Sequence, residues 1–129
     1  MRMRSRSALF VLLAAFLLAC SDDTNSPTAG AMNLNLATPN SDDGGLLFTL
    51  TGGPVDSVVA TSGRVYSAKV DPNSFRVIIA GNLAAGTIAR IYLPDLRRAG
   101  EYSATVTQAA ARGSYVQRDP AGYTLTLSE

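Results

Sequence analysis

The sequence contains no histidine and no tryptophan, and its 129 residues include a single cysteine. Without histidine the chain lacks the most common general base and metal ligand, which excludes Ser-His-Asp and Cys-His catalytic sites. A single cysteine excludes an intramolecular disulfide. These absences predict a protein that is not an enzyme and carries no cofactor.

The first twenty residues have the pattern of a secretory signal peptide. Arg2, Arg4 and Arg6 precede twelve almost wholly apolar residues at 8–19. A single cysteine comes next, and the polar residues Ser21-Asp22-Asp23 follow it directly. A basic start, a short apolar run and small residues at its end are the marks of such a peptide. The run is too short to span a bilayer as a helix, which needs about 20 residues.

The segment Leu17-Leu18-Ala19-Cys20 resembles the lipobox of bacterial lipoproteins. The resemblance implies removal of residues 1–19, a diacylglycerol on the thiol of Cys20, and acylation of the new amino terminus. Two or more acyl chains hold a protein firmly in a membrane, at about 0.8 kcal/mol per buried methylene. In the sorting rules of that family, Ser21 in place of aspartate favours the outer membrane. The alternative is an ordinary signal peptide with an incidental cysteine.

The processed chain is nearly neutral and long enough for one domain. Residues 21–129 have a net charge near −2, which argues against a nucleic-acid surface, where basic residues would cluster. Residues 20–31 comprise Cys20 and a polar stretch without periodic apolar residues, and they are expected to form a flexible tether. The remaining chain, 32–129, can bury a core without disulfides.

From residue 32 onward, apolar and polar residues alternate in short runs that are separated by clusters of Gly, Pro, Asn and Asp. Period-two alternation is typical of half-buried strands. The expected strands occupy residues 32–36, 46–51, 56–61, 65–70, 75–80, 87–93, 102–108 and 123–127. About eight short strands without a helix predict an all-β antiparallel β-sandwich, of jelly-roll or immunoglobulin-like type.

Charged residues fix the expected faces of the two most β-prone runs. Arg76 should face water, which places Phe75, Val77 and Ile79 in the core, because side chains alternate across a strand. By the same reasoning Arg90 places Ala89, Ile91 and Leu93 inward, with Ile88 outward. Three residues are candidates for protecting edge strands: Pro54, Lys69 and Pro94.

Several segments resemble cohesin-type domains. Residues 45–50 and 55–58 are similar to the early strand pair of that family, 75–80 to its middle strand, 85–93 to a turn that enters a long inner strand, and 104–127 to its end. The resemblance implies a jelly-roll sandwich that binds a partner without catalysis. Cohesins bind a calcium-loaded partner domain, and their wider superfamily includes carbohydrate-binding modules.

Asn40, Asp42 and Asp43 are weak candidates for calcium ligands, since they offer oxygen atoms beside Gly44 and Gly45. No glutamate closes an EF-hand loop after them. A polar turn that caps a strand is the simpler interpretation, so no metal site is expected.

Five tyrosines could form a platform on which sugar rings stack: Tyr66, Tyr92, Tyr102, Tyr115 and Tyr123. The ordinary alternative for each is a packed ring with its hydroxyl at the rim of the core. Arg90, Arg97 and Arg98 could bind an anionic polymer or lie in a solvated loop. Two functional hypotheses follow. The first is a lipid-anchored envelope module that binds an unknown envelope protein, and the second is a carbohydrate-binding module that holds polysaccharide.

Overall fold

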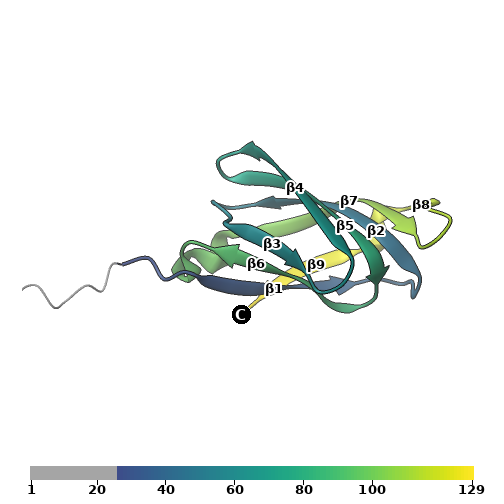
Figure 1. The fold of residues 1–129 in the computed structure, drawn as a ribbon, viewed down its shortest axis with the longest axis horizontal. Helices are drawn as coiled ribbons and strands as arrows, with labels where there is room; N and C mark the ends of the chain where they lie inside the picture. Colours follow the sequence, from purple (N-terminus) through teal and green to yellow (C-terminus); the bar gives the residue numbers. More distant parts are fainter. Residues whose placement is uncertain (1–25) are drawn as a thin grey trace, which may run out of the picture.

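The structure is a computed structural model that describes residues 26–129; residues 1–25, which include Cys20, lie outside the described residues. Over the described range, nine strands form two antiparallel sheets that pack face to face, and two short 3-10 helices lie in the connections between strands (Figure 1). The predicted all-β sandwich is therefore confirmed.

The four-stranded sheet has the order β3-β6-β1-β9, and the five-stranded sheet has the order β4-β5-β2-β7-β8. The strands of the first are β1 (Gly30–Ala37), β3 (Ser57–Ala60), β6 (Gly86–Leu93) and β9 (Thr124–Ser128). Those of the second are β2 (Asp43–Thr51), β4 (Arg64–Asp71), β5 (Ser74–Leu83), β7 (Ser103–Ala111) and β8 (Gln117–Arg118). The two 3-10 helices are η1 (Leu96–Glu101) and η2 (Pro120–Gly122).

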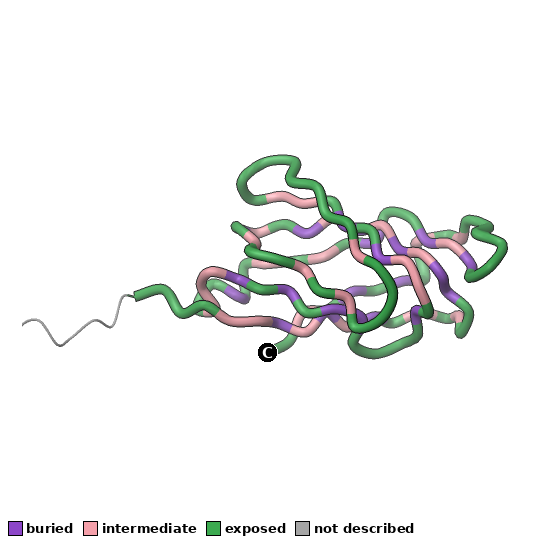
Figure 2. The backbone as a smooth tube through the Cα atoms, in the orientation of Figure 1, coloured by how far each residue is buried: buried purple, intermediate pink, exposed green. Residues whose placement is uncertain are grey.

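The core lies between the sheets and is built from alternate residues of each strand, which Figure 2 shows as buried positions separated by exposed ones. Phe48 and Ile79 of the five-stranded sheet and Leu34 and Ile91 of the four-stranded sheet are among its largest fully buried side chains. The predicted faces of β5 are confirmed, because Val77 and Ile79 are buried and Arg76 is exposed.

The prediction that Ile88 faces outward is wrong, since this side chain is only 4 % exposed and belongs to the core. Leu34 of β1 pairs with Ala89 of β6, whereas the next residue, Asn35, pairs with Thr87. Ile88 is thus the extra residue of a β-bulge, which interrupts strict alternation. Ile88 and Ala89 are both buried as a result.

The outermost strands are β3 and β9 in one sheet and β4 and β8 in the other. Lys69 lies on β4, where an edge charge was expected to discourage strand addition. Pro94 follows β6, which is an inner strand, and Pro54 lies between β2 and β3. These two prolines therefore do not lie on an edge strand.

Candidate binding face

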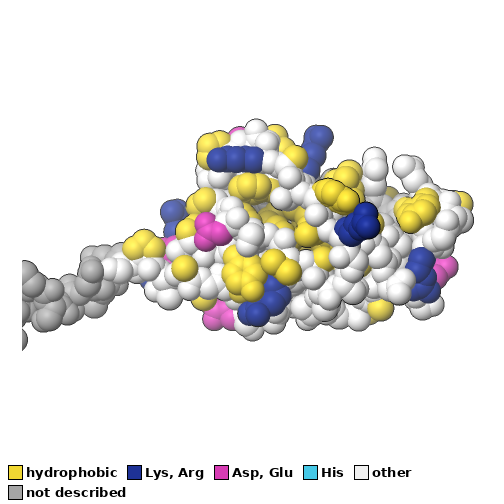
Figure 3. Space-filling model, viewed as in Figure 1, with side chains coloured by type: hydrophobic (Ala, Val, Ile, Leu, Met, Phe, Trp, Pro, Cys, Tyr) yellow, Lys and Arg dark blue, Asp and Glu magenta, His cyan; other side chains and the backbone are white. Residues whose placement is uncertain are grey.

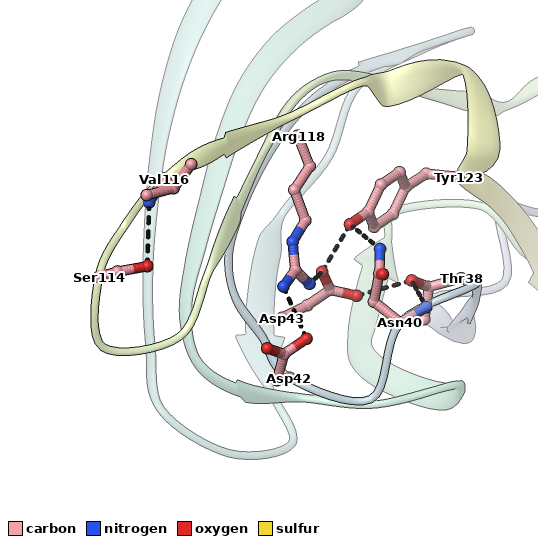
Figure 4. A network of polar contacts seen from close by, with 8 residues as sticks. All are labelled: Thr38, Asn40, Asp42, Asp43, Ser114, Val116, Arg118 and Tyr123. Carbon is pink, nitrogen blue, oxygen red and sulfur yellow. Dashed lines mark hydrogen bonds and ion pairs between the residues drawn. The ribbon is translucent and has the colours of Figure 1, made fainter.

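The acidic turn before β2 is occupied by a polar network (Figure 4). Asp43 is fully buried. Its carboxylate accepts hydrogen bonds from Thr38 Oγ1 at 2.6 Å, Tyr123 OH at 2.5 Å and Arg118 Nη1 at 2.8 Å. The amide of Asn40 donates to the Tyr123 hydroxyl at 3.0 Å. The network ties the start of the five-stranded sheet to the end of the chain.

Arg118 bridges the two neighbouring carboxylates, because its Nη2 lies 2.7 Å from Asp42 and its Nη1 2.8 Å from Asp43. The hydrogen bond from Arg118 lowers the pKa of Asp42, and the bond to Asp42, with that to Asp43, raises the pKa of Arg118. Carboxylate oxygens of Asp42 and Asp43 are thus engaged by donors of the chain itself. No group of three or more His, Cys, Asp or Glu residues that could hold a metal occurs within residues 26–129.

A row of outward side chains crosses four strands of the five-stranded sheet. Tyr66 of β4 lies opposite Ile78 of β5, Ile78 opposite Leu47 of β2, and Leu47 opposite Gln108 of β7. Tyr66 is 59 % exposed and Ile78 45 % exposed. Two or three apolar side chains side by side on a solvated sheet are unusual where one face is expected to be polar. In Figure 3, hydrophobic side chains reach the surface over β4, β5 and β8, with Lys and Arg among them.

Next to this row lies a shallow hollow of about 210 Å³. Gly45 and Ala110, small residues in adjacent strands, lower its floor, and Tyr115 and Gln117 line it at the β8 end. No charged side chain lines the hollow. We call this surface the tyrosine face, defined by Leu47, Tyr66, Ile78, Gln108, Tyr115 and Gln117.

Tyr115 is held in an unfavourable backbone conformation. Its φ of 56° makes it the one non-glycine residue of the described range with positive φ. A non-glycine residue in this left-handed region costs roughly 1–2 kcal/mol. The ring is 67 % exposed, so burial does not offset that cost. Strain that packing does not repay is characteristic of positions used for function.

On the opposite face of the sandwich, polar side chains of neighbouring strands hydrogen-bond to one another. On the four-stranded sheet Asn35 donates to Ser128 Oγ at 2.9 Å and accepts from Thr87 Oγ1 at 2.8 Å. The guanidinium of Arg90 lies 5.7 Å from the ring centroid of Tyr92. This face also exposes Val59 and Tyr92, but its polar side chains pair with one another, whereas the five-stranded sheet presents a continuous apolar row beside a hollow.

The five predicted tyrosines do not form one platform. Tyr66 and Tyr115 belong to the tyrosine face, and Tyr92 lies on the other sheet. Tyr123 is buried in the Asp43 network. The hydroxyl of Tyr102 donates to the carbonyl of Pro54 at 2.6 Å, and burial raises the pKa of this phenol.

The predicted group of three arginines is likewise divided. Arg97 pairs with Asp95 at 3.0 Å, Arg98 pairs with Glu101 at 3.0 Å, and Arg90 lies over Tyr92. The hydrogen bond from Arg97 holds the pKa of Asp95 well below its usual value. Arg97 and Arg98 thus pair with acids at η1, Arg90 lies on β6, and the three do not form a basic cluster.

Sequence reasoning overlooked Leu47, Gln108 and Gln117 as surface residues of interest. A signal was present at Ile78, which shares the water-facing side of β5 with Arg76 and is nevertheless a large apolar residue. Its neighbours become visible only once the register of β2, β5 and β7 is known.

No family model, no curated protein and no solved structure matches this chain. The resemblance to cohesins and to lipoproteins stays a prediction. Within residues 26–129, no helix is both long and apolar enough to cross a membrane.

Proposed function

We propose that this protein is a lipid-anchored binding module of the bacterial cell envelope, and that its partner binds without catalysis on the tyrosine face. The observation that carries the proposal is the uncharged hollow of about 210 Å³ on the outside of a regular sheet. Its floor is apolar and amide side chains stand beside it, an arrangement typical of small binding sites.

The residues that line the hollow support binding and not chemical conversion. They offer apolar side chains, two carboxamides and one phenol, and no carboxylate, amine or thiol. General acid–base catalysis needs a group with a suitable pKa within hydrogen-bond reach of the substrate. The hollow is lined by no Asp, Glu, Lys or His side chain, the groups that most often fill this role.

The position of the hollow suits a module that is tethered at Cys20. The chain enters β1 at one end of the long axis, and β8 lies at the other end (Figure 1). Because Tyr115 and Gln117 belong to the β8 end, the hollow points away from the tether. A partner can therefore reach the hollow without displacing the anchor. Ser21 directly after Cys20 favours the outer membrane as the place of that anchor.

Carbohydrate is a second candidate partner, and a specific observation favours it over a protein. Tyr66 lies on the edge strand β4, and Tyr115 lies in the loop before β8 on the opposite edge. Three to four strand spacings separate them, roughly 14–19 Å. Exposed aromatic rings offer apolar faces to sugar rings, and the carboxamides between them can both donate and accept hydrogen bonds.

Photocrosslinking in intact cells tests whether the tyrosine face is the binding face. A benzophenone amino acid placed at position 47 of the full chain should yield crosslinked adducts, which Tyr115→Ala should reduce strongly. The same amino acid at position 33, on the outer face of the four-stranded sheet, is the matched control and should yield few. Equal adducts from both positions, or none from position 47, would contradict the proposal.

A further inference from the structure

Resting on the binding face proposed above, we infer that the tyrosine face takes an anionic polysaccharide, a chain whose sugar rings carry carboxylates. The juxtaposition that supports this is an apolar row flanked on both sides by arginines that have no acidic partner among residues 26–129. The sugar rings would lie along the row of Tyr66, Ile78 and Leu47, and the carboxylates would reach the arginines.

The two arginines stand on either side of the row. Arg64 precedes Tyr66 by two residues on β4 and lies opposite Ala80; Arg76 precedes Ile78 by two residues on β5 and lies opposite Ala68 and Thr49. Residues two apart on a strand point to the same side and are roughly 6.5–7 Å apart. Each guanidinium is thus placed one row away from the apolar side chains.

The positive charge of Arg64 and Arg76 is not neutralised within the described part of the chain. Arg97, Arg98 and Arg118 each have an ion-pair partner, whereas neither Arg64 nor Arg76 has one within residues 26–129. The outward positions of β2, β4, β5 and β7 in the three rows described include no Asp or Glu. Residues 21–129 carry a net charge near −2, so a local basic surface attracts anions to this face specifically.

The form of the surface favours a polysaccharide over an acidic peptide. Backbone groups of β5, β2 and β7 are already paired on both sides, so an extended peptide on the face gains no main-chain hydrogen bonds, which supply its affinity when it adds to a sheet edge. Sugar rings need no such bonds. They can use the exposed rings and the carboxamides of Gln108 and Gln117.

The same surface fits an anionic bilayer poorly. Segments that bind acidic lipids have clusters of roughly four to eight basic residues, and this face has two. Three of its apolar side chains, Leu47, Ile78 and Tyr115, line a hollow.

Binding of the full chain, purified in mild detergent, to defined polymers tests the inference. Alginate and polygalacturonate provide carboxylates on sugar rings, dextran provides neutral sugars, polyglutamate provides carboxylates without rings, and phosphatidylglycerol vesicles provide an anionic bilayer. We expect binding to at least one polyuronate, weakened by added salt. Arg64→Gln and Arg76→Gln should each weaken that binding by roughly tenfold.

Arg90→Gln, an outward arginine of the other sheet, is the matched control and should leave the affinity unchanged. Polyglutamate or vesicles bound as tightly as the polyuronates would overturn the inference, as would binding that survives both arginine substitutions. If both polyuronates fail to bind while crosslinks from position 47 persist, this inference is wrong and the binding face stands. If the crosslinks are also absent, the proposed function fails with it.

Discussion

At the scale of single residues, Tyr115 is a position where the residue best for folding stability differs from the residue best for binding. Its backbone is in the left-handed region, and its amide donates a hydrogen bond to the carbonyl of Ala111 at 3.0 Å, which closes the turn after β7. Asparagine tolerates this region far better than tyrosine does. The residue that folds best at this position is therefore not the residue that offers an aromatic ring to a ligand.

Tyr115→Asn should leave the free energy of unfolding unchanged or raise it by up to about 1 kcal/mol, because strain is relieved and little buried surface is lost. The same change should weaken polyuronate binding by about tenfold or more, since tyrosines are frequent binding hot spots. Urea denaturation and polymer titration measure the two effects. Tyr92→Ala serves as the control for binding, and a large loss of stability in Tyr115→Asn would refute the assignment of strain.

Asp43 illustrates what the sequence could and could not predict about a polar residue. The turn that caps a strand was expected from Asn40, Asp42 and Asp43 together, but a lone carboxylate gives no sign of the distant Arg118 and Tyr123 that enclose it. Partners 75 and 80 residues away are set by topology, which local patterns do not contain.

Asp43→Ala should destabilise the fold by about 3–5 kcal/mol, because Thr38 and Tyr123 lose their acceptor and the guanidinium of Arg118 loses its buried partner. Asp42→Ala is the matched control, since it removes the exposed partner of the same arginine and should cost much less. Thermal or urea unfolding of both variants separates these outcomes. Similar losses in the two variants would show that the buried bonds of Asp43 are not what stabilises this end of the sandwich.

At the scale of the elements, alternation predicted most strands because each sheet has one face in the core and one in water. In β5, Arg76 fixes the orientation of every other residue, and the observed burial agrees. In β6, Arg90 correctly places Ala89, Ile91 and Leu93 inward, but the bulge opposite Leu34 and Asn35 changes the phase at Ile88. The two-residue strand β8 escaped prediction because it is too short to show any period.

Ile88→Ala should cost about 2–5 kcal/mol of unfolding free energy, the usual range for truncating a buried isoleucine. Ile91→Ala should cost a similar amount, since both side chains are in the core. Ile78→Ala removes the same atoms from an exposed side chain and should change stability by about 0.5 kcal/mol or less. Chemical denaturation of the three variants measures this. A small effect at Ile88 would contradict the bulge.

At the scale of the whole molecule, the ordered domain begins earlier than the expected tether of residues 20–31 allows. Thr28 is already attached to the sandwich, because its carbonyl accepts from the amide of Leu96 at 2.7 Å and its own amide donates to Asp95 at 3.3 Å. Between Cys20 and Thr28 lie residues 21–27, which reach at most about 25 Å when extended. With the proposed lipid on Cys20, a domain on so short a tether would stay near the membrane, and its ligand should belong to the same surface.

A domain held close to the membrane requires a lipid on Cys20, and we predict that this lipid is present. The protein isolated from envelopes should lack residues 1–19 and carry the mass of a diacylglycerol and an acyl chain at its new amino terminus, as the Leu17-Leu18-Ala19-Cys20 segment implies. Three acyl chains would keep the protein in the membrane fraction at high salt, because salt does not screen hydrophobic anchoring. Detergent should release it. Mass spectrometry and membrane fractionation measure both properties. Cys20→Ser should abolish lipid attachment while the sandwich, which begins at Gly30, keeps its fold and its affinity for polyuronates. A wild-type chain that starts elsewhere without added lipid would refute the anchor and leave the binding face to be judged by its own experiments.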